Sequence, residues 1–168
     1  MRKERWLEFQ DRFTSGIPGL LPLVLDMPVR FTASDNRKQG VFKHSRGTLR
    51  GWVLTDNEEE RLRGIDEPEV VLKEWPLRLL VEVETATSAM PDSYGKGVYA
   101  VRLQARTWTR DAGGNAKVRR TGFPIVPDFG GTAHAYCGST LSACIGNLLP
   151  WWKKPSRDDT LKAYIIKS

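Results

Sequence analysis

The sequence predicts a mixed α/β fold that is mostly β, with short strands in the middle of the chain and a helix near each end. Apolar and polar residues alternate in two central segments, and turn residues separate the strands at regular spacing. Helical periodicity occurs only near the two ends of the sequence. With 168 residues, of which 40% are hydrophobic and 27% charged, the chain can form one domain, or one domain that carries a small inserted one.

The first third of the chain predicts one helix and three strands. Trp6, Phe9 and Phe13 have helical spacing within residues 3–14, and the Gly- and Pro-containing "SGIPG" ends that helix. The segment "LLPLVLDMPVRFT" is interpreted as two short strands joined at Asp26, and "TLRGWVL" as a third strand. Between them, "NRKQGVFKHSRG" is a polar, turn-rich loop. The acidic "TDNEEERLRGIDEPE" that follows is interpreted as an exposed insertion.

The middle of the chain shows the clearest strand pattern. In "LRLLVEVETA", Leu77, Leu79, Val81 and Val83 share one face, as expected of a half-buried strand. "GVYAVRLQARTW" alternates in the same way, "DAGGNA" has the composition of a hairpin turn, and "KVRRTGFPIV" returns. These short, regularly spaced strands favour a small barrel or sandwich. A second helix is predicted in "SRDDTLKAYIIKS", with Ser156 as its N-cap.

Positive charge is concentrated in the last part of the chain. Residues 1–100 have 15 Lys and Arg against 16 Asp and Glu, whereas residues 101–168 have 11 against 4. Such an excess attracts nucleic acid or another polyanion, although it is also compatible with an ordinary solvated surface. No segment has the length and hydrophobicity of a membrane span or a secretory signal, so we expect no membrane partner. Cys137 and Cys144 are too few for a disulfide framework and are expected to be reduced thiols of an intracellular protein.

No pattern of residues forms a recognisable catalytic set. The sequence has no G-x-x-x-x-G-K-[ST] phosphate loop, no G-x-S-x-G elbow and no H-E-x-x-H pair. His134 and Cys137 have a spacing that would suit two metal ligands, but a structural zinc site needs four, and only Cys144 and the distant His44 could be added. Nothing orients a Cys137–His134 nucleophile pair either. We therefore expect no catalytic residues, no metal and no cofactor in this chain.

Four segments resemble one helicase family. "FPIVPDFGGTAHAYCGSTL" is similar to the P-L-x-x-A-x-A-x-T-x-H-K-x-Q-G-x-T-L segment of RecD-like superfamily-one DNA helicases, the branch that includes the yeast mitochondrial-recombination helicase family. "LLPLVLDMPVRFT" resembles the family's G-M-P-V-M-L-T strand, "VFKHSRGTLRGWV" its N-G-x-x-G-x-V turn and strand, and "LKAYIIKS" its Y-V-A-[LI]-S-R helix. The four segments occur in the family's order and cover roughly residues 17–168.

The resemblance implies a small SH3-like antiparallel barrel inserted in a partial RecA-like α/β domain. Residues 1–26 would form the N-terminal helix and first strand of that RecA-like domain, residues 27–122 the inserted barrel, and residues 123–168 the remaining RecA-like segment. In such helicases the phosphate loop, the metal-binding acidic motif and the transition-state arginine lie in other parts of the protein. The resemblance therefore implies ATP and Mg²⁺ only for a complete parent, with an N-terminal motor domain as the partner of this segment.

The resemblance also supplies the candidate DNA-binding residues. Thr132, His134, Gly138 and Thr140 fall on fixed positions of the family segment, whereas Ala135 and Cys137 replace its Lys and Gln. The basic excess adds Arg119, Arg120, Lys153 and Lys154, the last two beside the aromatic Trp151 and Trp152. Since Arg119 and Arg120 are adjacent in a strand, their side chains are expected on opposite faces. The expected ligand is single-stranded DNA, bound weakly and without sequence preference.

Three functional hypotheses follow. The chain is a C-terminal segment of an ATP-dependent DNA helicase, a non-enzymatic nucleic-acid-binding module descended from one, or a protein-interaction module without a nucleic-acid role. In the first case the segment contributes DNA contacts and does not hydrolyse ATP by itself. We expect an intracellular protein, for which the nucleus and the mitochondrion are the two compartments considered.

Overall fold

The computed structural model describes residues 14–87, 94–95, 97–109 and 117–130. The chain divides into two compact units, Met1–Asp128 and Phe129–Ser168. The predicted helices of residues 3–14 and 156–168 fall almost wholly outside the described residues, and so do the turn 111–116 and both cysteines. The fold given below is that of the first unit.

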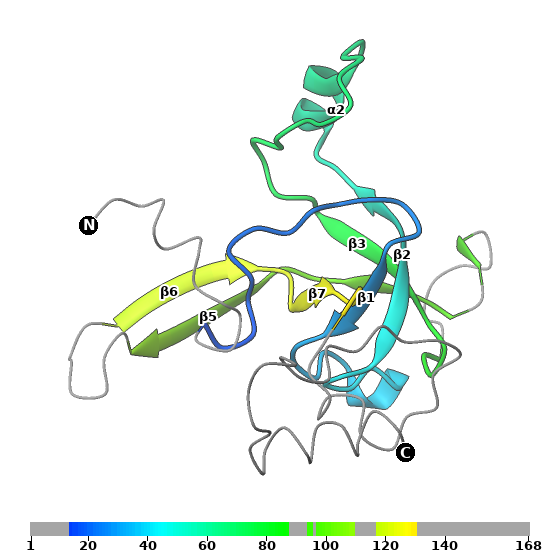
Figure 1. Ribbon diagram of the computed structural model, residues 1–168, viewed down its shortest axis with the longest axis vertical. Helices are drawn as coiled ribbons and strands as arrows, with labels where there is room; N and C mark the ends of the chain where they lie inside the picture. Colours follow the sequence, from blue (N-terminus) through cyan, green and yellow to red (C-terminus); the bar gives the residue numbers. More distant parts are fainter. Residues whose placement is uncertain (1–13, 88–93, 96, 110–116, 131–168) are drawn as a thin grey trace, which may run out of the picture. The chain divides into compact units, whose positions relative to one another are not determined.

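An antiparallel five-stranded sheet forms the body of this unit (Figure 1). Its strand order is β4-β3-β2-β1-β7, with β1 at Pro28–Phe31, β2 at Arg46–Val53, β3 at Arg78–Val83, β4 at Val98–Val101 and β7 at Ile125–Pro127. The 3-10 helix η2, Arg37–Gln39, lies in the loop between β1 and β2. A register shift between Leu49 and Gly51 marks a bulge in β2, which bends the strand there.

The core lies on one face of this sheet, and the alternation of β3 shows why. Leu79, Val81 and Val83 are buried as predicted, and they pack with Val29, Phe31 and Leu49 of the neighbouring strands. The prediction is wrong for Leu77, which precedes β3 and is 48% exposed. Leu21 and Leu23, from the segment before β1, pack against the same cluster. Successive side chains of a strand point to opposite faces, so the intervening Arg30, Arg50 and Glu82 lie on the other face.

A separate two-stranded ribbon is formed by β5, Gln104–Thr109, and β6, Lys117–Gly122. The ribbon extends away from the five-stranded sheet (Figure 1). The predicted strand 97–108 is therefore two strands, because β4 ends at Val101 and β5 pairs only with β6. Burial explains the division: Val98, Tyr99 and Val101 are buried, whereas the side chains of β5 alternate between half-buried and exposed.

The strands predicted for the barrel are antiparallel, as expected, but they do not close into a barrel. Within the described residues the sheet is open, with β4 and β7 at its two edges. β7, in the segment expected to be RecA-like, pairs with β1. The segment before β1 contains no strand between residues 14 and 27. Its prolines, Pro18 and Pro22, have no N–H group to give to a ladder, and Asp26 adopts a left-handed φ of 62°. The predicted pair of strands at residues 20–32 is thus one strand, β1.

The acidic insertion forms an arm, defined as residues 54–77, that leaves the sheet between β2 and β3 (Figure 1). It contains α2, Asp56–Leu62, whose N-cap Thr55 accepts a hydrogen bond from the Glu58 N–H. The buried Glu58 carboxylate pairs with Arg61 and accepts from the Lys73 N–H at 2.9 Å. These bonds, Arg61 first, lower the pKa of Glu58 to about 2. The arm therefore has its own internal contacts and is not an unstructured loop.

Candidate nucleic-acid interface

The loop between β1 and β2, here called the basic loop and defined as residues 36–46, has a backbone held by hydrogen bonds. The Asn36 side chain accepts from the Gln39 N–H and caps η2, and Asn36 forms a β-bridge with Val41. Gly40 has a φ of 76°, and a Cβ there would lie 2.1 Å from the Thr85 carbonyl oxygen. Thr85 donates to the Gly40 carbonyl at 2.9 Å. The glycine lets the loop approach the chain that follows β3.

The tip of the basic loop is equally well bonded. The Phe42 N–H donates to Ser45 Oγ at 3.0 Å, and the Lys43 N–H donates to Ser34 Oγ at 3.0 Å. His44 has a left-handed φ of 72° and donates its N–H to the Phe31 carbonyl at 2.8 Å. Because the backbone polar groups at the tip are used in this way, the side chains of Phe42 and Lys43 project from a preorganised turn.

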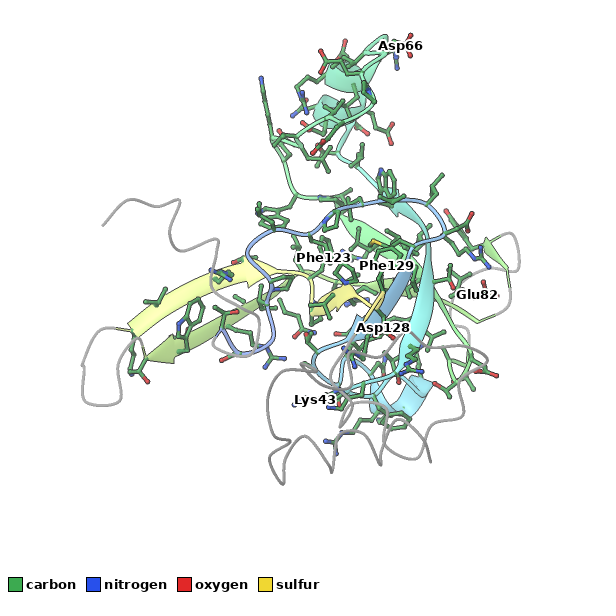
Figure 2. All side chains as sticks on the ribbon, in the orientation of Figure 1. Lys43, Asp66, Glu82, Phe123, Asp128 and Phe129 are labelled. Atoms are coloured by element: carbon green, nitrogen blue, oxygen red, sulfur yellow. The ribbon has the colours of Figure 1, made fainter. Side chains whose placement is uncertain are left out.

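The exposed side chains of the basic loop are cationic and aromatic. Phe42 is 46% exposed, and the exposed basic residues are Arg37, Lys38, Lys43 and Arg46, with His44 beside them. Arg37, Lys38 and Lys43 make no ion pair with any carboxylate of the described residues. Figure 2 shows Lys43 at the end of the unit opposite Asp66 of the arm. A rigid aromatic side chain among cations of this kind suits a polynucleotide, whose bases stack and whose phosphates pair with Lys and Arg.

Other arginines of the sheet are neutralised within the protein. Arg30 and Arg46 occupy directly opposed positions of β1 and β2, and Asp128 lies between them, with Nε–Oδ distances of 3.4 and 3.1 Å. The contact of Arg30 with Asp128 Oδ1 is an ion pair only, since Oδ1 accepts no hydrogen bond within the described residues. Arg50 pairs with Glu82 and Asp26, and these bonds, that of Glu82 first, raise its pKa.

A chain of hydrogen bonds joins the start of the basic loop to the ribbon. Tyr99 donates its hydroxyl to Asp35 at 2.7 Å, and the Gln104 amide donates to the other oxygen of Asp35. Arg106 donates to the Gln104 side-chain oxygen at 2.6 Å. Burial, with the bond to Asp35 second, raises the pKa of Tyr99 above its ordinary value. Asp35, directly before the basic loop, therefore fixes this end of the loop against β4 and β5.

Arg119 and Arg120 lie on opposite faces of the ribbon, as the alternation of side chains along a strand predicts. Arg119 is exposed on one face. Arg120 is half-buried on the other face, donates to the Ile17 carbonyl at 3.1 Å and lies over the Trp108 ring, 5.4 Å from its centroid. Burial lowers the pKa of Arg120. Of the two arginines, Arg119 is the one whose side chain is exposed to solvent.

The remaining candidates from the sequence lie outside the described residues, so their role in DNA binding stays a prediction: Thr132, His134, Gly138, Thr140, Lys153 and Lys154. Within the described part of the chain, no three or more His, Cys, Asp and Glu side chains group in a way that could hold a metal ion. No helix of that part is long and apolar enough to cross a membrane.

Sequence reasoning did not select Arg37, Lys38, Phe42 and Lys43 as candidate binding residues. A signal was present, because no acidic residue occurs between Asp35 and Asp56 while five Lys and Arg do. The comparison of residues 1–100 with residues 101–168 hid this local excess. The arm that follows has eight acidic residues against three basic ones between 55 and 77, and these cancel the positive charge of the loop in the sum.

Comparisons with known proteins give structural matches only. No family model matches the chain, and no curated protein matches it. Among solved structures, it is similar to the Pif1 helicase from Candida albicans, with 20% identity and a TM-score of 0.48 over 75% of this chain and 26% of that one. It is also similar to unliganded Pif1 from Bacteroides sp, with 12% identity and a TM-score of 0.42 over 86% of this chain and 27% of that one. The chain thus spans about a quarter of the length of these superfamily-one helicases, and the RecD-like branch stays a prediction.

Proposed function

We propose that this chain is a helicase-derived segment whose basic loop binds single-stranded nucleic acid. The observation that carries the proposal is the presence of three exposed cations, Arg37, Lys38 and Lys43, in the same loop as the exposed Phe42 and without a carboxylate partner in the described residues. The helicase relation itself rests on the four sequence segments and their order.

The composition of the loop favours a single strand without sequence preference. An aromatic ring stacks on any base, and its access requires unpaired bases. Lys43 and Lys38 contact phosphates as point charges, which positions the strand and does not read its sequence. The ATP and Mg²⁺ chemistry of a helicase is assigned to the motor domains of a complete parent, and this segment contributes only contacts with the nucleic acid.

The test is fluorescence anisotropy of a labelled oligothymidylate at several salt concentrations. Three or four phosphate contacts predict a slope of log affinity against log salt of roughly −2 to −3, at about −0.7 per contact. The variant with Arg37→Gln, Lys38→Gln and Lys43→Gln should lose about two units of slope. Phe42→Ala should lower the affinity about fivefold or more at unchanged slope, since stacking releases no counterions.

Arg50→Gln is the matched control, because it removes one cation whose charge is already paired with Glu82 and Asp26. Its affinity and slope should stay close to those of the wild type. The proposal fails if the triple variant behaves like this control. An absence of binding even at low salt would favour the protein-interaction module, for which the arm offers the 81% exposed Val71 as a contact.

A further inference from the structure

Two arginines face each other directly across the ribbon. Arg106 of β5 and Arg120 of β6 are register partners, and both side chains lie on the half-buried face with Trp108. Like charges in directly opposed positions of an antiparallel pair destabilise it. The pair therefore needs a compensating group.

The same arrangement on the five-stranded sheet has such a group. Arg30 and Arg46 are also register partners, and there the carboxylate of Asp128, with only 6% of its side chain exposed, bridges both guanidinium groups. On the sheet, the Asp128 carboxylate thus lies between the opposed Arg30 and Arg46. On the ribbon, no carboxylate of the described residues forms an ion pair with Arg106.

The bonding of Arg106 is incomplete. Its Nη2 donates to the neutral Gln104 side-chain oxygen at 2.6 Å, while its Nε is buried and has no hydrogen-bond partner in the described residues. Asp35 does not supply the missing acceptor, because its two oxygens accept from Tyr99 and Gln104. Arg120 already has its own contacts, with the Ile17 carbonyl and the Trp108 ring. The donor left without a hydrogen bond at this face is therefore the buried Nε of Arg106.

We infer that Arg106 binds an oxyanion of the phosphate class on the half-buried face of the ribbon, in the position that corresponds to Asp128 on the sheet. A guanidinium group presents its N–H donors in a planar fork that matches phosphate oxygens, and the bonds are strengthened by both charges. The site is separate from the basic loop. The phosphate can belong to a nucleic-acid backbone or to a small phosphate compound, and only the first source rests on the proposed function.

The binding step is tested with inorganic phosphate on the full chain labelled with ¹⁵N, in chloride buffers of matched ionic strength. The Arg106 Nε–Hε resonance, identified by its loss in Arg106→Gln, should shift saturably with phosphate. Phosphate should also raise the Tm of the wild type by mass action. Lys117→Gln is the matched control, because it makes the same charge change on the exposed face of the same ribbon. It should keep this stabilisation, whereas Arg106→Gln should lose it.

Two results would overturn the inference: an Nε–Hε resonance that phosphate does not shift, or an equal gain in Tm for Arg106→Gln and Lys117→Gln. The first would mean that water satisfies the Nε. If Arg106→Gln does not fold, as circular dichroism would show, Arg106→Lys, which keeps the positive charge and lacks the guanidinium, identifies the resonance instead, and the titration of the wild type decides.

The source of the phosphate is distinguished with the labelled oligothymidylate. For a backbone phosphate, Arg106→Gln should reduce the magnitude of the salt slope by about 0.7, while Arg50→Gln leaves it unchanged. An unchanged slope together with a phosphate-dependent Arg106 resonance identifies a small phosphate compound. If the basic-loop variants do not weaken oligonucleotide binding but the resonance still shifts, the proposed function is wrong and the phosphate site stands.

Discussion

Replacing the buried Asp128 carboxylate should destabilise the first unit far more than replacing an exposed one. Asp128→Asn keeps the shape of the side chain and removes its charge from between Arg30 and Arg46. Breaking a buried ion pair costs about 3–5 kcal/mol, but the side chains of Arg30 and Arg46 are 17% and 43% exposed, so water recovers part of this. We expect a loss of about 2 kcal/mol in the free energy of unfolding.

Glu82→Gln is the matched comparison, because it removes a carboxylate from the same face in an equally isosteric way. Glu82 and its partner Arg50 have side chains 42% and 45% exposed, for which a loss of about 0.5 kcal/mol is expected. Urea unfolding followed by circular dichroism measures both losses, provided that the slope m is unchanged. The cost of Asp128→Asn should persist at high salt, since buried charges are screened less. Equal costs for the two variants would refute the assignment of Asp128 as a bridge.

Three further predictions concern the arm, the basic loop and the core. The pKa of Glu58 is lowered from 4.5 to about 2, so its stabilisation of the arm should be complete above about pH 4.5 and lost as the pH falls towards 2. The amide protection factors of α2, corrected for the intrinsic exchange rate at each pH, should fall over the same range, and in Glu58→Gln they should be low and independent of pH. Gly40→Ala forces a Cβ against the Thr85 carbonyl at a φ of 76°. It should lower the free energy of unfolding, measured in urea, by about 1–3 kcal/mol. Gly64→Ala is the control and should cost less, because Gly64 also has a positive φ but has open space around it. Leu49→Ala in the core should cost about 2–5 kcal/mol, whereas Val71→Ala at the surface should stay within about 0.5 kcal/mol; similar costs for these two would contradict the burial of Leu49.

The parts of the fold that the sequence predicted are those with a local physical cause. The alternation of Leu79, Val81 and Val83 predicted a half-buried strand because side chains on a pleated strand repeat every two residues, and β3 buries all three. The opposite orientation of Arg119 and Arg120 follows from the same period. Such features need no knowledge of which strands pair.

The features that the sequence did not predict depend on contacts between distant residues. The break between β4 and β5 follows from which strand pairs with which, and the alternation through residues 98–108 gives no sign of it. The bridge from Asp128 to Arg30 and Arg46 joins residues far apart in the chain, so no local pattern marks it. The arm helix was missed for a different reason, because Thr55 and Glu58 have the spacing of a capping box and the acidity of the segment was interpreted as exposure alone.

Net charge is a poor guide to the proposed polyanion site, because some of the cationic side chains are already paired with carboxylates and others are not. Arg30, Arg46, Arg50 and Arg61 are paired with carboxylates within the protein, so each contributes little to attraction at a distance. The arm has more acidic than basic residues. Its Asp66 and Lys43 of the basic loop lie at opposite ends of the unit (Figure 2). If the chain binds a polyanion as proposed, the first end would repel it and the second would attract it, which would orient its approach before any contact forms. The paired Arg30, Arg46 and Arg50 of the sheet would then compete little with the basic loop.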